Sequence, residues 1–254
     1  MTGVSKYGLI GRNLEYSFSP TFFNSAFEQA GMACIYDLID VASLEELDDT
    51  LLKGYAGLNV TIPYKESILQ RMDELSPEAE AIGAVNCIQM IEDRLVGHNT
   101  DIIGFRDSLR PILKSTHHKA LILGTGGASK AIAYVLQNMG IEFLKVSRNP
   151  EKGDVTYKDL NDKALRYFPL IINTTPSGTF PNVEDAPPIP FEHLGPWNLV
   201  YDLIYNPEET LLLSKAKECG ALTINGQRML EGQAIASWKI WTGTDWIGSG
   251  EPSV

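Results

Sequence analysis

The stretch KALILGTGGASKAIAYVL, residues 119–136, predicts a strand, a glycine-rich turn and a helix in direct succession. Gly124 allows the tight turn after the strand, and Gly126 lets the backbone come close to a pyrophosphate. Ser129 is small enough for the helix to pack against the strand, and the N–H groups at the helix start face the phosphates. The segment therefore indicates a dinucleotide-binding domain, with an ordinary glycine-rich turn as the alternative. A Walker-type loop is excluded because no Gly-Lys-Ser/Thr follows.

The next strand, residues 142–146, decides which dinucleotide is expected. Sites for NAD usually carry an acid about 20 residues after the glycines, where it holds the ribose hydroxyls. Here the strand ends in Ser147 and Arg148, and the first acid is Glu151. An arginine at this place can pair with a 2′-phosphate and lie on the adenine. The pattern favours NADP over NAD, although Arg148 could also be an exposed loop residue.

Strand-like and helix-like segments alternate on both sides of this loop, which is typical of an α/β fold with parallel sheets covered by helices. Further strands are expected at residues 6–11, 57–62, 85–91, 95–98, 170–173, 199–203 and 221–224. Helices are expected at residues 43–54, 101–113, 130–139, 208–219 and 227–242, and after the Ser-Pro pairs at 19–20 and 76–77. Ser19 is the expected N-cap of the first helix, and Ser43 with Glu46 forms a capping box.

Composition excludes several classes of protein. The 254 residues carry 32 acidic and 21 basic side chains, a formal net charge of −11. Nucleic acid is therefore not an expected partner, since phosphate backbones favour basic surfaces. The three cysteines form no CxxC pair and the four histidines have no metal-ligand spacing, so we expect neither a disulfide framework nor a metal site. No apolar run reaches the ~18 residues of a membrane span, and the start lacks a signal peptide, so a cytoplasmic protein is expected.

Polar residues stand at strand ends throughout the first hundred residues. They are Ser17, Ser19, Asn59, Thr61, Lys65, Asn86 and the triplet Asn99-Thr100-Asp101. The two serines precede a helix, where hydroxyls and a helix start form an anion site without a cation. Asn59 and Thr61 alternate with apolar residues and so point to one face of their strand. Each residue alone is more often structural, but together they favour a pocket for a polyhydroxylated ligand.

Nine short motifs together resemble the shikimate dehydrogenase family, in the family's order and over essentially the whole chain. They are YSFSP (16–20), NVTIPYK (59–65), GAVN (83–86), NTD (99–101), GTGGAS (124–129), SR (147–148), NTTPSG (173–178), YDLIYNP (201–207) and NGQRMLEGQA (225–234). The resemblance implies NADP-dependent, reversible reduction of 3-dehydroshikimate to shikimate, a step of aromatic amino acid (chorismate) biosynthesis. It implies a small-molecule substrate and a monomer or homodimer.

The resemblance also implies a domain organisation and a set of site residues. Residues 1–104, completed by the C-terminal helix 227–254, would form an α/β substrate domain; residues 105–226 would form a Rossmann-type NADP-binding domain, with the active site in the cleft between them. Lys65 and Asp101 would be the catalytic pair. The substrate would contact Ser17, Ser19, Asn59, Thr61, Lys65, Asn86, Asp101, Tyr205 and Gln233. The cofactor would contact Gly124, Thr125, Gly126, Gly127, Ala128, Ser129, Ser147, Arg148, Leu203, Gly226 and Met229.

Four residues depart from the family's commoner pattern, and three rival functions remain. Tyr16 replaces a frequent His, Ser147 replaces a frequent Asn, and Glu231-Gly232 replaces Val and a small residue. The nearest rival is a quinate/shikimate dehydrogenase of dual specificity; the missing acid after residue 146 speaks against its NAD-dependent form. A folate-type methylene dehydrogenase would lack the NTD motif and the paired serines. A non-catalytic dinucleotide sensor would not need Lys65 and Asp101.

Overall fold

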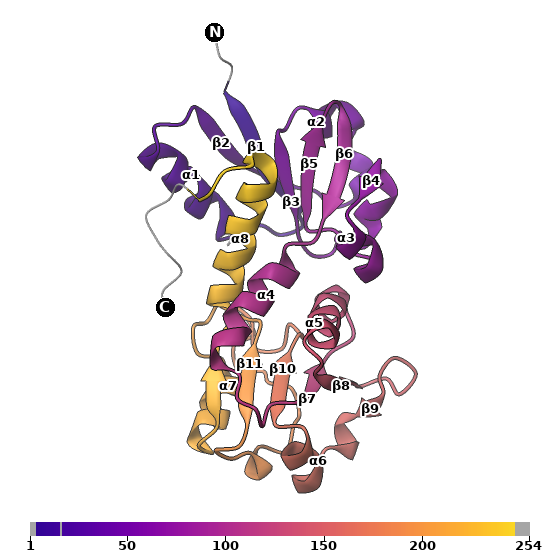
Figure 1. Cartoon of the computed structure of the whole chain (residues 1–254), viewed down its shortest axis with the longest axis vertical. Helices are drawn as coiled ribbons and strands as arrows, with labels where there is room; N and C mark the ends of the chain where they lie inside the picture. Colours follow the sequence, from indigo (N-terminus) through magenta and orange to yellow (C-terminus); the bar gives the residue numbers. More distant parts are fainter. Residues whose placement is uncertain (1–3, 16, 247–254) are drawn as a thin grey trace. The chain divides into compact units, whose positions relative to one another are not determined.

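The computed structural model describes residues 4–15 and 17–246 of the chain. The chain divides into two compact units, each built on a six-stranded sheet (Figure 1). The discontinuous unit consists of Met1–Asp101 and Gln233–Val254, and the continuous unit is Ile102–Gly232. These limits lie a few residues from the expected 104/105 and 226/227. Both passages of the chain between the units fall inside or at the start of helices, α4 (Asp101–Leu109) and α8 (Gln227–Thr242).

The sheet of the discontinuous unit is mixed, with the strand order β2-β1-β3-β5-β6-β4. Its strands are β1 (Ser5–Gly11), β2 (Cys34–Asp40), β3 (Gly57–Val60), β4 (Glu74–Leu75), β5 (Cys87–Ile91) and β6 (Arg94–His98). Three strands, β2, β1 and β3, are parallel, whereas β5 is antiparallel to both β3 and β6. A hairpin joins β5 to β6, the strands expected at residues 85–91 and 95–98, and Glu92 and Asp93 turn it with φ of +47° and +67°. The parallel pairing expected from the alternation of strands and helices holds in this half for β2, β1 and β3 and for the β4–β6 pair, but not for β5.

The helices of this unit begin where local capping allows. They are α1 (Ser19–Gln29), α2 (Asp49–Lys53), α3 (Pro77–Ile82) and the later part of α8. The capping box at Ser43 and Glu46 is present, but it opens only a short 3₁₀ turn, and Leu47 is extended. Asp48 then caps α2, so the single helix expected over 43–54 was wrong. Phe18, not Ser19, is the N-cap of α1.

Two apolar clusters cover the two faces of this sheet. β1 alternates between them, with Tyr7 and Leu9 in one and Ile10 in the other. The first cluster is aromatic: Phe23 of α1 stacks on Tyr36 of β2 at 4.6 Å between ring centroids, and Trp238 of α8 is fully buried beside them. Helix α8, made from the last part of the described chain, therefore completes the core of a sheet made from the first hundred residues.

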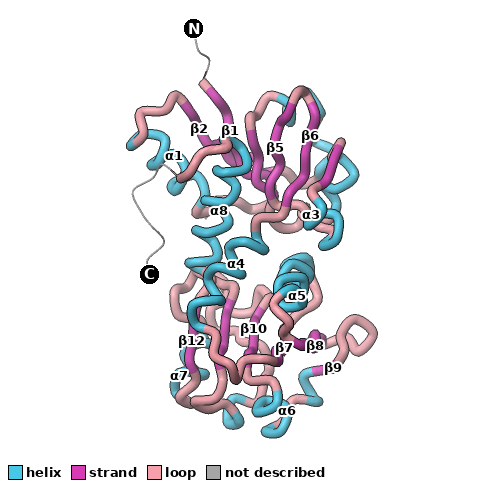
Figure 2. Tube along the Cα trace, viewed as in Figure 1, coloured by secondary structure: helices cyan, strands magenta, loops and turns pink. Residues whose placement is uncertain are grey.

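The continuous unit has the Rossmann-type architecture that the glycine loop predicted (Figure 2). Its all-parallel sheet has the order β12-β11-β10-β7-β8-β9, with β7 (Lys119–Leu123), β8 (Glu142–Ser147), β9 (Val155–Thr156), β10 (Leu170–Asn173), β11 (Leu199–Asp202) and β12 (Leu222–Ile224). Its helices are α4, α5 (Gly127–Asn138), α6 (Asp162–Tyr167), α7 (Leu211–Glu218) and the first residues of α8. The strand order reverses between β7 and β10, the place where such sheets bind ligands.

Two expected helices differ in length from the observed ones. Helix α4 ends at Leu109 and continues only as a 3₁₀ turn, because Pro111 cannot donate the next helical hydrogen bond. Helix α7 begins at Leu211 after Thr210 caps it, not at Glu208. Over residues 4–15 and 17–246, no helix is both long and apolar enough to cross a lipid bilayer. The same residues contain no group of three or more side chains arranged to hold a metal ion.

Candidate active site

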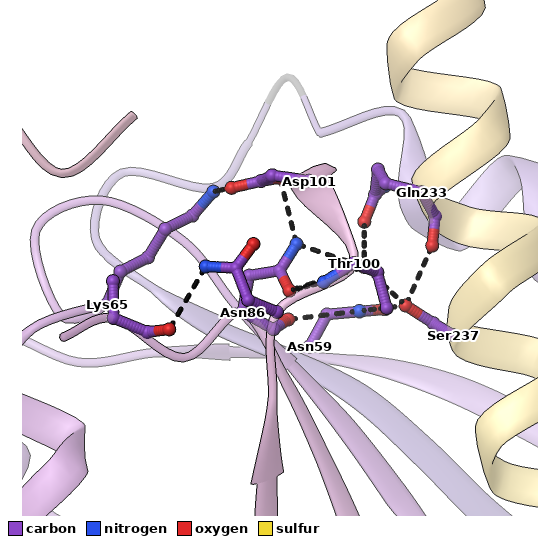
Figure 3. A network of polar contacts seen from close by, with 9 residues as sticks. Asn59, Lys65, Asn86, Thr100, Asp101, Gln233 and Ser237 are labelled. Atoms are coloured by element: carbon purple, nitrogen blue, oxygen red, sulfur yellow. Dashed lines mark hydrogen bonds and ion pairs between the residues drawn. The ribbon is translucent and has the colours of Figure 1, made fainter. Parts of the chain in front are cut away.

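Lys65 and Asp101 form an ion pair in the discontinuous unit (Figure 3). Lys65 Nζ lies 2.7 Å from Asp101 Oδ2, and their side chains are 20% and 9% exposed. The backbone of Lys65 is fixed because its carbonyl accepts from the N–H of Val85 at 2.8 Å. Asp101 is the first residue of α4, where the helix dipole favours a carboxylate. The structure thus brings together the two residues expected to be the catalytic pair, which are 36 positions apart in the sequence.

Asn86 holds the second oxygen of this carboxylate. Its Nδ2 donates to Asp101 Oδ1 at 2.8 Å and to Thr100 Oγ1 at 3.0 Å. Its Oδ1 accepts from the backbone N–H of Thr100 at 2.6 Å, which fixes the orientation of the amide. Asn86 is buried and lies just before β5, not within a strand as expected. Both of its amide hydrogens are therefore engaged in orienting the pair.

Asn59, at the third position of β3, also forms hydrogen bonds through both its amide nitrogen and its amide oxygen. Its Nδ2 donates to Asn86 O at 3.2 Å and to Ser237 Oγ at 2.9 Å, while its Oδ1 accepts from Tyr36 Oη at 2.8 Å. Thr61 follows after the strand end and packs over Gly11, where a Cβ would lie 2.5 Å from the threonine methyl. The amide of Asn59 thus links the strand to α8.

The paired serines lie at the start of α1. Ser17 Oγ accepts from the backbone N–H of Ser19 at 3.4 Å. Ser17 is half-buried, whereas Ser19 is buried. Burial raises the pKa of Tyr36 well above its usual value, and a hydrogen bond with Ser19 opposes this rise. Because Tyr36 donates to Asn59, Ser19 is connected to the network around the ion pair. Tyr16, which departs from the family's pattern, lies outside the described residues.

Two members of the network, Ser237 and Tyr36, were absent from the expected site, whereas Thr100 was expected there only as part of the polar triplet 99–101. Thr100 bonds with Asn86 and approaches Gln233 Oε1 at 3.4 Å and Ser237 Oγ at 3.1 Å. The sequence did offer a signal for Ser237, because it stands four residues after Gln233 and so lies on the same face of α8. Tyr36 belongs to a strand, β2, that sequence reasoning did not identify.

Two of the three glycines in the loop of the continuous unit, Gly124 and Gly126, have different backbones and surroundings. Gly124 has φ of +111°, and a Cβ there would lie 2.7 Å from Thr174 Oγ1. Gly126 has an ordinary backbone and open space where a Cβ would be. It is the N-cap of α5 and supplies no side chain to cap the first N–H groups. An open approach to uncapped N–H groups fits a pyrophosphate. Ser129 is buried and donates to Gly126 O at 2.6 Å, which closes the first turn.

The end of β8 carries Ser147 and Arg148. Ser147 is buried and accepts from the N–H of Asn149 at 3.1 Å, so its hydroxyl shapes the turn. Arg148 is exposed. Burial raises the pKa of the nearby Tyr157 hydroxyl, and the charge of Arg148 opposes the rise. The structure thus leaves an exposed arginine directly after the strand end, the residue type that can pair with an adenosine 2′-phosphate.

The remaining expected cofactor residues gather at the ends of β11 and β12. A Cβ on Gly226 would lie 2.0 Å from Leu203 O, so only glycine fits against that carbonyl. Leu203 and Met229 both pack against the apolar cluster formed by β7, β10 and α5. Tyr205 follows in the same loop, and burial raises its pKa. These contacts fix the loop after β11 onto the start of α8.

Asp202, at the end of β11, is a fully buried carboxyl group. It accepts from Asn173 Nδ2 at 2.9 Å, Thr210 Oγ1 at 2.7 Å and the N–H of Ile204 at 3.1 Å. Burial nevertheless raises its pKa to about 6 against the effect of these donors. The residue ties the ends of β10 and β11 together.

Comparison with known proteins identifies the family of this chain. The family model described as the shikimate dehydrogenase substrate binding domain matches residues 9–88. A protein from Methanococcus aeolicus named shikimate dehydrogenase (NADP(+)) is 38% identical over 93% of this chain and 91% of its own length. The chain belongs to the shikimate dehydrogenase family.

Solved structures of shikimate dehydrogenases share the fold. Shikimate 5-dehydrogenase from Thermus thermophilus, solved in complex with NADP(H) and shikimate, matches with a TM-score of 0.84 and 31% identity over 95% of this chain and 94% of that one. Quinate dehydrogenase from Corynebacterium glutamicum, solved in complex with NAD, matches with a TM-score of 0.85 at 27% identity over 96% and 95%. The two-sheet α/β architecture expected for a shikimate dehydrogenase is therefore confirmed.

Proposed function

We propose that this protein catalyses the NADP-dependent, reversible reduction of 3-dehydroshikimate to shikimate. The single observation that carries the proposal is the Lys65–Asp101 ion pair at 2.7 Å, held by Asn86 in a chain of the shikimate dehydrogenase family. A lysine held by a carboxylate can stabilise the oxygen of a carbonyl group as it is reduced and can give it a proton. A dinucleotide sensor without turnover would have no use for it.

The pair supplies the proton of the reaction. As the carbonyl carbon is reduced, its oxygen gains negative charge and takes up a proton. The Lys65 ammonium stabilises that charge and donates the proton, and Asp101 holds the ammonium in place. Asn86 in turn keeps the carboxylate from rotating, since it binds the oxygen that Lys65 leaves free.

We further propose roles for the other polar residues of the discontinuous unit as the substrate domain. Ser17 and Ser19, at the start of α1, would bind the substrate carboxylate. The ring hydroxyls would be recognised by Thr61, Lys65, Asp101 and Gln233. Asn59 and Asn86 have their amide hydrogens engaged within the protein, so they would contact the ring through oxygen or act through their neighbours.

The continuous unit would hold NADP, whose reduced form, NADPH, supplies the hydride for the reduction when bound. The residues present fit that cofactor: Gly126 leaves open space at the uncapped start of α5, and Arg148 stands where a 2′-phosphate needs a cation. The rest of the holding set would be Gly124, Thr125, Gly127, Ala128, Ser129, Ser147, Leu203, Gly226 and Met229. No acid follows β8 before Glu151, which favours NADP over NAD.

The alternative of dual quinate and shikimate specificity is not favoured. The quinate dehydrogenase that this chain resembles was solved with NAD and is 27% identical, against 38% for the NADP-dependent relative. We also propose a place in aromatic amino acid biosynthesis and a cytoplasmic location, which suits three free cysteines. A monomer or homodimer is the expected state.

The test is NADPH oxidation measured in parallel with 3-dehydroshikimate and 3-dehydroquinate, each repeated with NADH. We expect turnover of 3-dehydroshikimate with NADPH and slow or no reaction in the other three combinations. Comparable rates with 3-dehydroquinate would establish the dual enzyme, and no turnover in any combination would refute the proposal.

A further inference from the structure

Ser237 of α8 stands at the junction of the polar network, although it touches neither Lys65 nor Asp101. Its side chain is fully buried. Its Oγ lies 2.9 Å from Gln233 O, 2.9 Å from Asn59 Nδ2 and 3.1 Å from Thr100 Oγ1 (Figure 3). A serine that only bonds back to the carbonyl four residues earlier is ordinary within a helix. Further side-chain partners set Ser237 apart: Asn59 of β3, Thr100 before α4, and Cys87 of β5, with which it also forms a hydrogen bond.

The direction of these hydrogen bonds follows from the atoms involved. An amide nitrogen cannot accept, so Asn59 Nδ2 donates to Ser237 Oγ. Ser237 has one hydrogen, and the carbonyl of Gln233 is its acceptor at the shorter distance. The hydroxyl of Thr100 can then donate to Ser237 and point toward α8. In that orientation, a lone pair of Thr100 Oγ1 faces Asn86 Nδ2, which donates to it at 3.0 Å.

Loss of the Ser237 hydroxyl would change the bonding of Thr100. Its hydrogen would turn to the next acceptor, Asn86 Oδ1, which already lies 3.2 Å away. Asn86 Oδ1 would then accept the hydrogen bond from the Thr100 hydroxyl. The opposite hydrogen bond, from Asn86 Nδ2 to Thr100 Oγ1, would weaken. That nitrogen also holds Asp101 Oδ1, so the carboxylate beside Lys65 would lose part of its support.

We propose that Ser237 is a positioning residue for the Lys65–Asp101 pair, acting through Thr100 and Asn86. The proposal rests on the proposed function for its kinetic consequence, but the orientation of Asn86 is a property of the protein alone. Ser237 touches no reacting atom. It fixes the direction of one hydroxyl, and that hydroxyl fixes the amide that orients the carboxylate.

The experiment compares Ser237→Ala with Ser108→Ala. Ser108 is a matched control because it is also a buried helical serine, bonded to Phe105 O at 3.0 Å and to Tyr201 Oη at 2.7 Å in the continuous unit. We expect Ser237→Ala to lower kcat about tenfold with a smaller change in KM for 3-dehydroshikimate. Ser108→Ala should lower Tm to a similar extent and leave kcat within twofold.

A second measurement does not depend on turnover. In ¹⁵N-labelled protein, the carboxamide hydrogens of Asn86 should exchange with water about tenfold faster in Ser237→Ala than in the wild type or in Ser108→Ala. Unchanged exchange, or faster exchange with kcat within twofold of the wild type, would overturn the proposal. If the wild type reduced no substrate, the proposed function would fail while the exchange rates still decided whether Ser237 orients Asn86.

A double-mutant cycle with Thr100→Val shows whether Ser237 and Thr100 affect kcat through the same contact with Asn86 or independently of each other. If both hydroxyls act through Asn86, the double variant should be about as slow as the slower single variant. Multiplicative losses in kcat would mean that Ser237 acts elsewhere, and would also overturn the proposal.

Discussion

Lys65 Nζ lies 2.7 Å from Asp101 Oδ2, and this contact joins the loop after β3 to the first residue of α4. Neither residue is fully buried, so the ammonium keeps access to a ligand while the carboxylate limits its movement. The pair is useful chemically because the other carboxylate oxygen is held independently by Asn86.

Replacing Lys65 with Met keeps the length of the side chain and removes its charge and proton. The lost interaction is made mainly in the transition state, so kcat should fall by roughly 10²–10⁴ while substrate binding changes little. The measurement is kcat together with the Kd of shikimate. A kcat within a few-fold of the wild type, with Kd strongly raised, would make Lys65 a binding residue and require another proton donor.

Ser17→Ala should raise KM for shikimate with little effect on NADPH affinity. Each hydroxyl bonded to a carboxylate should contribute on the order of 1 kcal/mol or somewhat more. The comparison is with a shikimate analogue that lacks the carboxylate, whose KM should not respond to the substitution. An equal response by both compounds would remove the serine from the carboxylate site.

Arg148→Ala should weaken NADPH selectively. The guanidinium is exposed and free to meet a 2′-phosphate, and a charge-assisted contact of this kind is worth roughly 1.5–3 kcal/mol, or about 10- to 150-fold in Kd. Kd values for NADPH and NADH are measured on the same preparations. Equal losses for both cofactors would leave adenine stacking as the role of the residue.

Substitution by alanine should affect Gly124 and Gly126 of the loop differently. Gly126→Ala places a methyl group in open space, so Tm should change little, but NADPH affinity should fall because the pyrophosphate approaches there. Gly124→Ala combines φ of +111° with a 2.7 Å contact to Thr174 Oγ1, so it should destabilise the protein by about 1–3 kcal/mol. Thermal melts and NADPH titrations of both variants check this; unimpaired NADPH binding by Gly126→Ala would contradict the pyrophosphate assignment.

The buried Asp202 predicts a pH dependence of stability. Its pKa of about 6 lies above the ~3.9 of an unfolded aspartate, so between those values the folded state retains a proton that the unfolded state releases. Stability from this group is therefore present below pH ~4 and is lost as pH rises through 6, by on the order of 2–3 kcal/mol. Asp202→Asn should lack this loss while keeping partners for Asn173 and Thr210.

Urea unfolding of the wild type and Asp202→Asn between pH 4 and 7.5 checks the sign. The difference in unfolding free energy should move in favour of the variant up to about pH 6.5 and then level off. Parallel curves would show that the carboxyl group is ionised in the folded protein over the whole range.

The elements with sharp boundaries in the sequence were placed well. Residues 119–123, 170–173 and 227–242 match β7, β10 and α8 because short apolar runs or a long amphipathic run end at glycine or polar residues there. The strand β2 was not identified, and the break at Leu47 inside the segment 43–54 depends on where Asp48 caps the next helix. The capping box at Ser43 thus predicted that a helical segment begins there. It did not predict that this segment is a short 3₁₀ turn and that α2 begins separately after Asp48.

The residues of the candidate site were likewise predicted only in part. Lys65, Asn86 and Asp101 stand in recognisable motifs, and the structure joins them by direct hydrogen bonds. The only signal for Ser237 was its place four residues after Gln233, because a single serine in a helix acquires its partners only when β3 and Thr100 are packed against it. The position of a polar group within a core is a tertiary property, and one sequence does not contain it locally.

The division of the chain into a discontinuous and a continuous unit sets an order of assembly during synthesis. The ribosome releases residues 1–101 first, yet Trp238 and Ala234, which complete the aromatic cluster around Tyr7 and Phe27, leave it only near the end. The continuous unit, with all of its strands adjacent in the chain, can fold in the interval. We therefore expect the aromatic face of the first hundred residues to stay uncovered until α8 has been synthesised. A truncation after Gly232 should leave that face exposed to chaperones and proteases, whereas the continuous unit, which ends at Gly232, would be complete.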